Sequence, residues 1–396
     1  MADRPVIRLR PKIDPRPLKR GFPWVYANQL VTDRRTKAIE PGTVVTLEDA
    51  ERQPLATATI NPNSKLMARV LDLDPTADIG ADWLRDKVAR ALTLRDALYD
   101  TPYYRLIHAE ADGLPGTVVD RFGDALVIQP NAAWIDTLLP TFADILQSAT
   151  GAKTIVKNAQ GRARSLEGLD DVSSVLSGTL DGPVPVPMNG ATYMADLEGG
   201  QKTGLFYDQR PNHAFVARLS RGRDVLDVFS HVGGFALAAL AAGATSALSV
   251  DGSDAALALA EAGAEASGVT ERFATRKGDA FDVLETLASE GRVFGSVICD
   301  PPAFAPNKPA RDAGLRAYEK VARLAAPLVA PDGFLTLCSC SGAADLPAFQ
   351  NACLRGLGRT GRRVQLLRTG AAGPDHPRLP ALAESAYLKT LTFRLS

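Results

Sequence analysis

From about residue 220 onward, short strand-like runs alternate with helical runs, and this alternation limits the possible fold more than any other feature of the chain. The strand-like runs include DVLDVFS, SALSVD, GSVICD and GFLTLCSC, with helical runs such as GGFALAALAAG and DAALALAEAGAEASG between them. This pattern is typical of an open, mostly parallel α/β sheet. Ligands of such sheets bind beyond the carboxyl ends of the strands, so residues at those ends are the first candidates for function.

The first 190 residues follow a different pattern and predict two smaller domains. Runs such as VIRLR, GTVVTLED and KLMARVLDL, separated by turn-rich pieces, predict a small β-barrel or compact sheet over residues 1–75. Residues 76–190 predict a helix, a hairpin through Phe122-Gly123-Asp124 and a second helix, WIDTLLPTFADILQSA. The proline-rich run LDGPVPVPMNG disfavours regular structure, so we expect a boundary near residue 190 and a third domain over 191–396.

The first strand of the α/β region leads into a glycine-containing turn. The run starts at Asp227, passes Phe229 and Ser230, and reaches the glycine pair Gly233-Gly234. Paired glycines between a strand and a helix let a ligand approach the backbone and present free amide groups to it. The run does not satisfy G-x-G-x-x-G, so the dinucleotide fingerprint is absent and a nicotinamide dehydrogenase is disfavoured. A tight turn would also use these glycines, so the pair alone is weak evidence.

Acidic residues end the next two strands. Asp251 ends the second, and a carboxylate at this place can accept hydrogen bonds from both hydroxyls of a ribose. Asp279, followed by Ala280, ends the third and can accept from an adenine amino group. These positions predict a nucleotide-type cofactor at the carboxyl ends of the first three strands.

The fourth strand ends in Asp300-Pro301-Pro302, with Phe304 shortly after. Two prolines stiffen the turn and fix the carboxylate at the strand end, and the aromatic ring is placed to stack on a base. A rigid structural turn is the alternative interpretation. The combination favours a functional role for Asp300.

The fifth strand ends in two cysteines, Cys338 and Cys340, on one face of the strand. Their spacing does not suit zinc, and with only four histidines in the chain we expect no metal site. A buried structural thiol is the usual role of a cysteine. Cys340 lies nearer the carboxyl end of the strand, across from Asp300, so it is the candidate nucleophile.

Charge is unevenly distributed along the chain. The net charge is zero, but residues 1–40 hold ten basic and four acidic residues, a net charge of +6. Phe22, Trp24 and Tyr26 lie within this stretch, and basic residues mixed with aromatic ones predict a surface that contacts nucleic acid. A solvated basic face is the alternative.

The chain has the features of a cytoplasmic protein. No apolar run approaches the length of a membrane span, and the N-terminus lacks the apolar core of a secretory signal. All four cysteines lie in the last hundred residues, which suits a reduced compartment rather than a disulfide framework. We expect no membrane partner, and either a monomer or a homodimer.

Four segments together resemble the RlmI-type family of class I methyltransferases, which form 5-methylcytosine in large-subunit (23S) ribosomal RNA. The segments are QKTGLFYDQRPNH (201–213), DVFSHVGGFALAALAAG, ICDPPAFAPNK and LCSCSG. FPWVYANQL and ADGLPGTVVDRFGDALVIQ are similar to the same family, so the likeness extends over nearly the whole chain. His231 in the glycine loop and Cys338 beside the candidate nucleophile depart from the family pattern.

The resemblance implies a fold, a cofactor and site residues. It implies a PUA-like RNA-binding domain over 1–75, a small central α/β domain over 76–190 and a C-terminal Rossmann-like methyltransferase domain. The cofactor would be S-adenosylmethionine and the partner large-subunit rRNA. Cys340 matches the family's catalytic cysteine, and the stretch that ends in Arg210 matches a K-T-G-x-x-x-D-Q-R segment beside the cofactor pocket. The glycine pair and the acids of the second, third and fourth strand ends match cofactor-side residues: Gly233, Gly234, Asp251, Asp279 and Asp300.

The chemistry of cytosine methylation accounts for these residue types. C5 of cytosine is a weak nucleophile, and attack of a thiolate at C6 makes C5 reactive. Asp300 would stabilise the adduct near N3, and the base must be reached outside a stacked helix. Two alternatives stay open: an RNA base N-methyltransferase, which needs no thiol, and a non-catalytic RNA-binding ribosome-assembly factor, which would bind no S-adenosylmethionine.

Overall fold

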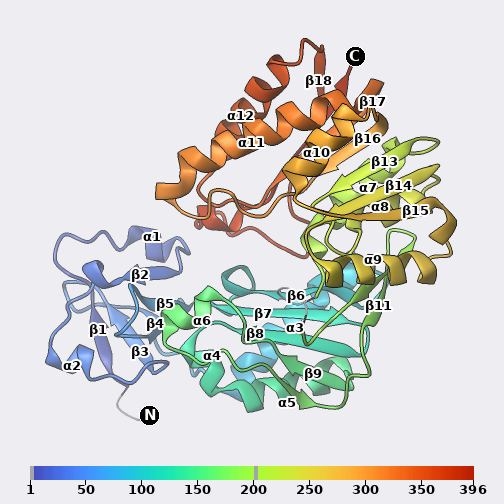
Figure 1. The fold of residues 1–396 in the computed structure, drawn as a ribbon. Helices are drawn as coiled ribbons and strands as arrows, with labels where there is room; N and C mark the ends of the chain where they lie inside the picture. The colour runs from blue at the N-terminus through green and yellow to red at the C-terminus, as the bar shows by residue number, and fades with distance from the viewer. Residues whose placement is uncertain (1–3, 200–203) are drawn as a thin grey trace. The chain divides into compact units, whose positions relative to one another are not determined.

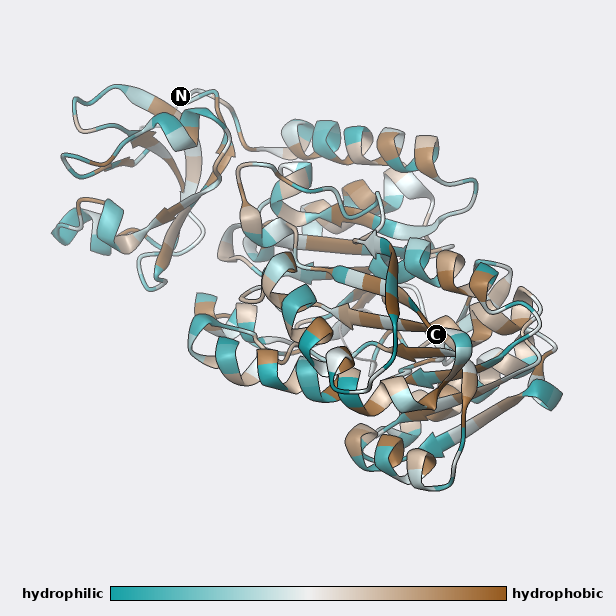
Figure 2. Ribbon diagram, turned by 90° about the horizontal axis from the view of Figure 1, so that it is seen from above, coloured by the Kyte–Doolittle hydropathy of each residue, from teal (hydrophilic) through white to brown (hydrophobic). Residues whose placement is uncertain are grey.

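The computed structural model describes residues 4–199 and 204–396 (Figure 1). The chain divides into two compact units, and each is built from non-contiguous segments. Unit 1 contains residues 1–182, 197–204 and 374–385, and unit 2 contains 183–196, 205–373 and 386–396. In both units the strands are mainly hydrophobic, whereas many helices alternate hydrophobic and hydrophilic residues (Figure 2). This is the pattern of helices that cover a buried sheet.

The N-terminal part of unit 1 is a five-stranded sheet with the order β1-β3-β4-β5-β2. All neighbours are antiparallel except β1 and β3, which are parallel. Alternating residues of these strands, such as Val45, Leu47 and Ile60, point into one small core. The strands are β1 (Val6–Arg8), β2 (Trp24–Tyr26), β3 (Val44–Glu48), β4 (Pro54–Ile60) and β5 (Leu66–Asp72).

The second part of unit 1 is a five-stranded sheet with the order β10-β9-β8-β7-β6. The hairpin expected through Gly123 joins β7 to β8, and helices α3 and α5 contact each other over this sheet's core. The strands are β6 (Tyr103–His108), β7 (Thr117–Phe122), β8 (Ala125–Pro130), β9 (Thr154–Lys157) and β10 (Ser174–Ser177). The helices are α3 (Ala81–Leu98), α4 (Ala133–Thr137), α5 (Leu139–Thr150) and α6 (Arg162–Glu167).

Two local predictions in this half of the chain were wrong. The run WIDTLLPTFADILQSA forms two helices, α4 and α5, because the chain restarts at Leu139 with Pro140 in the first turn, where a missing N–H costs no hydrogen bond. The proline-rich run is a strand, β11 (Val184–Met188), paired only with β12 (Ala191–Ala195). Pro185 and Pro187 alternate with inward-facing residues on this strand, where one side of the ladder is free and prolines are tolerated.

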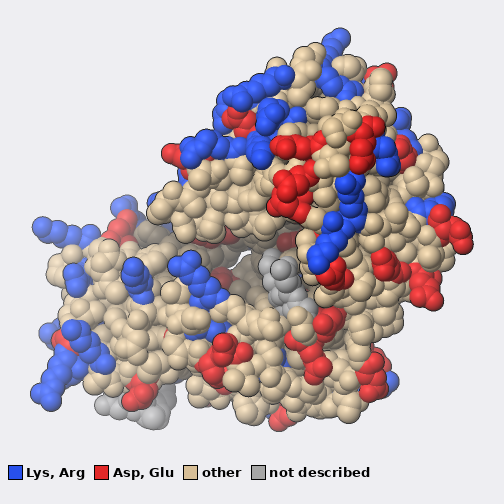
Figure 3. Space-filling model, viewed as in Figure 1, with Lys and Arg blue, Asp and Glu red and all other residues tan. Residues whose placement is uncertain are grey.

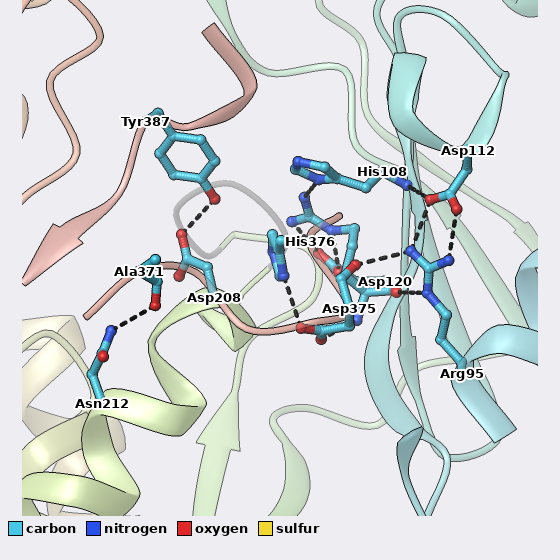
Figure 4. Close-up of polar contacts among 11 residues, drawn as sticks. Arg95, His108, Asp112, Asp120, Asp208, Asn212, Ala371, Asp375, His376 and Tyr387 are labelled. Carbon is cyan, nitrogen blue, oxygen red and sulfur yellow. Dashed lines mark hydrogen bonds and ion pairs between the residues drawn. The ribbon is translucent and has the colours of Figure 1, made fainter. Parts of the chain in front are cut away.

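Residues 374–385 belong to unit 1 although they follow β18 of unit 2. The buried Asp375 accepts hydrogen bonds from Arg95 of α3 and Arg105 of β6. Arg95 Nη2 donates to its backbone carbonyl (2.9 Å), and the Arg105 backbone N–H donates to its carboxylate (3.0 Å) (Figure 4). The ring of His376 lies 4.9 Å from that of His108. These contacts hold the segment within unit 1.

Unit 2 is a seven-stranded sheet with the order β15-β14-β13-β16-β17-β19-β18. Strands β13 to β17 are parallel and β19 is antiparallel to both neighbours, as the strand–helix alternation predicts. The chain runs outward from β13 to β15 and returns to β16 beside β13, so the order reverses between β13 and β16. The strands are β13 (Asp224–Val228), β14 (Ser246–Asp251), β15 (Phe273–Lys277), β16 (Phe294–Cys299), β17 (Val329–Ser339), β18 (Val364–Gly370) and β19 (Lys389–Leu395).

Two layers of helices cover this sheet (Figure 1). Helix α8 contacts α7 and α9, whereas α11 contacts α10 and α12. A large core cluster of unit 2 lies between the sheet and the second layer and includes Leu284, Phe294, Val321, Phe349 and Phe393. The helices are α7 (Arg210–Leu219), α8 (Gly234–Ala241), α9 (Asp254–Ala266), α10 (Ala280–Ser289), α11 (Arg311–Ala325) and α12 (Leu346–Gly358).

Candidate active site

The two candidate catalytic residues, Asp300 and Cys340, follow the carboxyl ends of two neighbouring parallel strands of unit 2, β16 and β17. Val228, the last residue of β13, pairs with Cys299, the last residue of β16, and Cys299 pairs with Leu337 of β17. The Asp300 backbone N–H donates to Val228 O at 3.2 Å. Because parallel strands end at one edge, Asp300 and Cys340 are placed at the edge where the strand order reverses, the usual ligand position in such sheets.

The turn after β13 has an unusual backbone. Phe229 and His231 have φ values of +61° and +50°, which non-glycine residues rarely adopt. Gly233 follows with φ +77°, and a side chain on Gly234 would lie 2.7 Å from His213 Cε1. The glycine pair is therefore required by the turn and by the packing of α7, whereas the strain lies at Phe229 and His231. Strain of this kind is concentrated at functional sites.

Asp227 and Ser230 each have a buried oxygen atom without a hydrogen-bond partner among the described residues. Asp227 is fully buried, and its Oδ2 accepts from the Ala236 backbone N–H at 3.0 Å. Within residues 4–199 and 204–396, Asp227 Oδ1 and Ser230 Oγ have no hydrogen-bond partner. Burial, and then the nearby charges of Asp300 and Asp251, raise the pKa of Asp227 well above its ordinary value. Buried polar atoms are normally paired, so these two fit a ligand that brings hydrogen-bonding groups.

Asp251 holds the glycine turn against the end of β14. Its Oδ2 accepts from the His231 backbone N–H and its Oδ1 from the Ser253 backbone N–H, each at 2.9 Å. Its half-buried carboxylate thereby supports the strained His231 and stays partly accessible. Each oxygen keeps a further lone pair for a hydroxyl donor.

Asp279 is exposed and caps helix α10. Its Oδ1 accepts from the Phe281 backbone N–H at 2.9 Å and from the Asp282 backbone N–H at 3.3 Å, and the buried Ala280 begins the helix. Such a cap stabilises the helix by about 1 kcal/mol, which is a structural role in its own right.

Asp300 is oriented by Gln209, a residue that sequence reasoning did not single out. Gln209 Nε2 donates to Asp300 Oδ2 at 2.9 Å, while Gln209 Oε1 accepts from Asn212 Nδ2 at 2.7 Å. Asn212 also donates to Ala371 O, and Tyr387 donates to Asp208 Oδ2, so this stretch is joined to the ends of β18 and β19 (Figure 4). The only signal in the sequence was the position of Gln209 between Asp208 and Arg210 in the D-Q-R run.

The segment 201–213, which is expected beside the cofactor pocket, is described only from Gly204 onward. Gln201, Lys202 and Thr203 lie outside the described residues. The backbone carbonyl of Arg210 accepts from Asn189 Nδ2 at 3.0 Å, and its guanidinium lies 5.7 Å from the centre of the Tyr207 ring.

The two cysteines after β17 differ in environment. Cys338 is buried, and its Sγ accepts a hydrogen bond from Thr390 Oγ1 at 3.5 Å. Burial, and then the charge of Asp300, raise the pKa of the Cys338 thiol well above its ordinary value. Cys340 is partly exposed, just past the last residue of the strand.

A buried chain of hydroxyl groups ties the Asp300 loop to the Cys340 loop. Ser341 Oγ accepts from the Ala305 backbone N–H at 2.9 Å and lies 2.7 Å from Tyr318 Oη. Ser339 Oγ donates to the same Tyr318 oxygen at 2.9 Å. The serines on both sides of Cys340 are therefore held by one tyrosine of α11, a feature with no signal in the sequence.

Phe304, expected to stack on a base, lies in an aromatic cluster. Its ring centre is 5.0 Å from that of Tyr318, 6.2 Å from Phe281 and 6.3 Å from Phe229. Phe229 and Phe304 lie in the loops after β13 and β16, whereas Phe281 belongs to α10 and Tyr318 to α11; Phe304 remains half-buried. The cluster gives this edge of the sheet an apolar floor.

The described residues contain neither a metal-binding cluster nor a helix that could span a membrane. No group of three or more His, Cys, Asp or Glu side chains there is arranged to hold a metal ion. None of the helices traced in the described ranges combines the length and apolar character needed to cross a membrane.

Comparisons with known proteins agree with this geometry. A model of S-adenosylmethionine-dependent methyltransferases matches residues 138–394, and a model of PUA-like domains matches residues 7–73. "Ribosomal RNA large subunit methyltransferase I" of Erwinia tasmaniensis is 33% identical over 383 residues, 96% of each chain. The protein of the same name from Shewanella denitrificans is 33% identical over 398 residues, covering 98% of this chain and 99% of its own.

A similar fold has been solved. A chain from Streptococcus mutans, described as an S-adenosylmethionine-dependent methyltransferase, superposes with a TM-score of 0.83 at 19% identity, covering 98% of this chain and 100% of its own. Another structure, of a methyltransferase complexed with SAH, has the same TM-score at 20% identity. The first superposition covers residues of both units, so the fold of each has a precedent among solved structures.

Proposed function

This chain belongs to the ribosomal RNA large subunit methyltransferase I family of S-adenosylmethionine-dependent methyltransferases, and we propose that it methylates C5 of a cytosine in large-subunit rRNA through a covalent adduct with Cys340. The observation that carries the proposal is a partly exposed thiol and an oriented carboxylate, Asp300, at the edge where the order of the parallel strands reverses.

Cys340 is the better nucleophile of the two thiols at this edge. A thiolate attacks, and burial suppresses its formation at Cys338, whereas Cys340 is accessible. The sulfur would form a bond to C6 of cytosine, and the electron pair of the C5–C6 double bond would move toward C5 and N3. After C5 has gained the methyl group, loss of its proton to a base restores the double bond and releases the thiolate.

Asp300 would act at N3 of the cytosine. A protonated carboxyl there donates to N3 and stabilises the charge that the attack at C6 pushes onto the ring. Gln209 donates to Oδ2 of Asp300 and so fixes the orientation of the carboxyl group. In this proposal Gln209 is a positioning residue and Asp300 a catalytic one.

The methyl donor of the family fits the first three strand ends. S-adenosylmethionine, when bound, supplies an electrophilic methyl group. The residues that would hold it lie at the end of β13 and in the turn after it, at the ends of β14, β15 and β16, and at the start of α7: Asp227, Phe229, Ser230, Gly233, Gly234, Asp251, Asp279, Ala280, Asp300 and Arg210. Among them, the buried open acceptors Asp227 Oδ1 and Ser230 Oγ are the strongest support.

The N-terminal part would hold the RNA. Lys and Arg side chains gather on the face of this part seen in Figure 3, in keeping with the net charge of +6 in residues 1–40. A basic surface attracts the phosphates of an RNA backbone. The model of PUA-like domains matches residues 7–73, within this part of the chain. We propose a PUA-like domain over 1–75, a central domain over 76–190 and a methyltransferase domain over 191–396.

A trapped adduct tests the proposal. RNA with 5-fluorocytosine at the target should form a stable protein–RNA adduct, because fluorine cannot leave C5 as a proton does. Cys340→Ser should abolish adduct and methylation, since an alcohol is a far weaker nucleophile near neutral pH. Cys338→Ser is the matched control and should keep most of the activity.

Three results would contradict the proposal. An adduct mapped to Cys338, or full methylation by Cys340→Ser, would move the chemistry elsewhere. A methylated exocyclic amine in the product would identify an N-methyltransferase instead.

A further inference from the structure

Lys389 is a buried lysine at the start of β19, a strand whose residues are all buried except Arg394. It is 6% exposed and pairs across the sheet with Ser339, the last residue of β17. Its Nζ donates to the backbone carbonyls of Ser341 at 2.6 Å and Ala344 at 2.7 Å. The side chain therefore reaches the turn that begins at Cys340.

The charge of Lys389 lacks a close counter-ion. Across the described parts of the chain, no carboxylate lies within 4.0 Å of its Nζ, and the two carbonyls to which it donates are neutral. Burial lowers the pKa of Lys389 to about 8, and the charges of Cys340 and then Asp345 oppose that shift. Asp345 is exposed and caps α12, so water screens its charge. The anion best placed to compensate a buried ammonium here is the thiolate of Cys340.

The other titratable groups around this turn do not favour a thiolate. Tyr318 of α11 interacts electrostatically with Cys340 and is neutral at ordinary pH. Asp300, after β16, and Asp345, at the start of α12, carry carboxyl groups, and a carboxylate in its ionised form disfavours a second negative charge nearby. Of these groups and Lys389, the lysine alone carries a positive charge.

We propose that Lys389 is a positioning residue for Cys340, whose ammonium favours the thiolate and whose two hydrogen bonds hold the turn from 340 to 344. The inference rests on the proposed role of Cys340 as nucleophile. In the ionisation, the S–H proton passes to solvent and the sulfur keeps the electron pair beside the ammonium. When the methylated base is released, the same charge stabilises the departing thiolate.

The experiment measures the thiol directly, without RNA or S-adenosylmethionine. Alkylation of Cys340 in the full chain by iodoacetamide is followed by mass spectrometry as a function of pH. In the unaltered protein the midpoint should lie below that of a free cysteine, about 8.5. A midpoint at or above this value overturns the proposal, whatever the variants do.

Variants then separate charge from hydrogen bonding. Lys389→Gln keeps an N–H donor without the charge, and Lys389→Met removes both. Each should slow alkylation of Cys340 at pH 7 by roughly tenfold, because a rise of one unit in the pKa of the Cys340 thiol lowers the thiolate fraction by that factor. Lys389→Arg should stay near the unaltered rate. Lys277→Met, at an exposed lysine of the same unit, is the matched control and should change nothing. An unchanged midpoint in folded Lys389→Gln overturns the role of the charge.

The result is independent of the proposed function. Failure of the 5-fluorocytosine adduct with a lowered, Lys389-dependent midpoint would refute the covalent mechanism and leave the thiol–lysine pair standing. If instead the adduct forms at Cys340 but the alkylation midpoint does not change in the Lys389 variants, the covalent mechanism stands and the proposed role of Lys389 is refuted.

Discussion

The Ala305 backbone N–H donates to Ser341 Oγ at 2.9 Å, so the loop that carries Asp300 is fastened to the loop that carries Cys340. The separation of the two candidate catalytic groups is thus set by hydroxyl groups of the protein itself. A shift of either loop would break a buried hydrogen bond, which makes the edge of the sheet rigid before any ligand arrives.

Loss of the Tyr318 hydroxyl should weaken this fastening. Tyr318→Phe leaves the hydroxyls of Ser339 and Ser341 without their shared partner, which should lower the free energy of unfolding by about 1–3 kcal/mol. We expect kcat to fall more than KM rises. Urea unfolding and steady-state kinetics check this, and a double-mutant cycle with Ser341→Ala should be non-additive. Additive effects would show that the two hydroxyls act separately.

Replacing Asp251 should weaken binding of S-adenosylmethionine. Asp251→Ala removes the acceptor for His231 N–H and the proposed ribose contacts, so we expect a loss of about 1–3 kcal/mol by calorimetry. Asp254→Ala, at an exposed carboxylate that begins α9, is the matched control. Undiminished affinity in the Asp251 variant would remove this residue from the site.

RNA binding should depend steeply on salt through the N-terminal part. Charge reversal at the exposed Lys19 and Arg20 should flatten the dependence of log K on log salt by about one phosphate contact each, because fewer counterions are released. Arg8 is a poorer probe, since it is paired with Glu48 at 3.0 Å and its reversal would also break an ion pair. A salt slope unaffected by both reversals would place the RNA elsewhere.

Acid should destabilise the fold through two histidines buried in the neutral form. Burial lowers the pKa of His213 to about 3, and burial with the nearby Arg105 lowers that of His108 to about 2, from an ordinary 6.5. Below pH 6.5 the unfolded chain binds these protons and the folded chain does not, so stability falls with pH by about 1.4 kcal/mol per unit for each histidine. Above 6.5 they contribute no slope.

The test compares slopes between variants. Free energies of unfolding at pH 7, 6 and 5 should fall less steeply in His213→Asn than in the unaltered chain, by about one proton. Equal slopes would mean that His213 is protonated in the folded state.

The acids at the strand ends could be predicted from the sequence because alternation of strands and helices brings successive carboxyl ends to one edge. Asp251 and Asp300 needed no further information. Gln209 did not follow from the same logic, because it precedes the sheet by a whole helix and meets Asp300 only after 91 residues of chain have folded. The signal for Lys389 in the sequence is a lysine within the strand-like run YLKTLTF, which does not by itself indicate a contact with the Cys340 turn.

Local rules also failed where tertiary context decided the outcome. The density of prolines argued against a strand at 184–188. In the structure the prolines occupy alternate positions of a strand that is paired on one side, so the missing N–H groups cost no hydrogen bond of the ladder. A continuous helix through Pro140 was expected because its apolar period is regular, but the ring ends one helix and begins the next.

The segment 374–385 has a consequence for how the protein is made. Unit 1 contains the first 182 residues, but the backbone and carboxylate of Asp375 that satisfy Arg95 and Arg105 leave the ribosome only after nearly all of the chain has been synthesised. Until then the guanidinium of Arg95 lacks one of its hydrogen-bond acceptors in the nascent N-terminal half. Unit 1 therefore cannot complete its folding in simple N-to-C order. A stop codon that deletes only the last 25 residues would thus damage the earliest part of the chain to emerge.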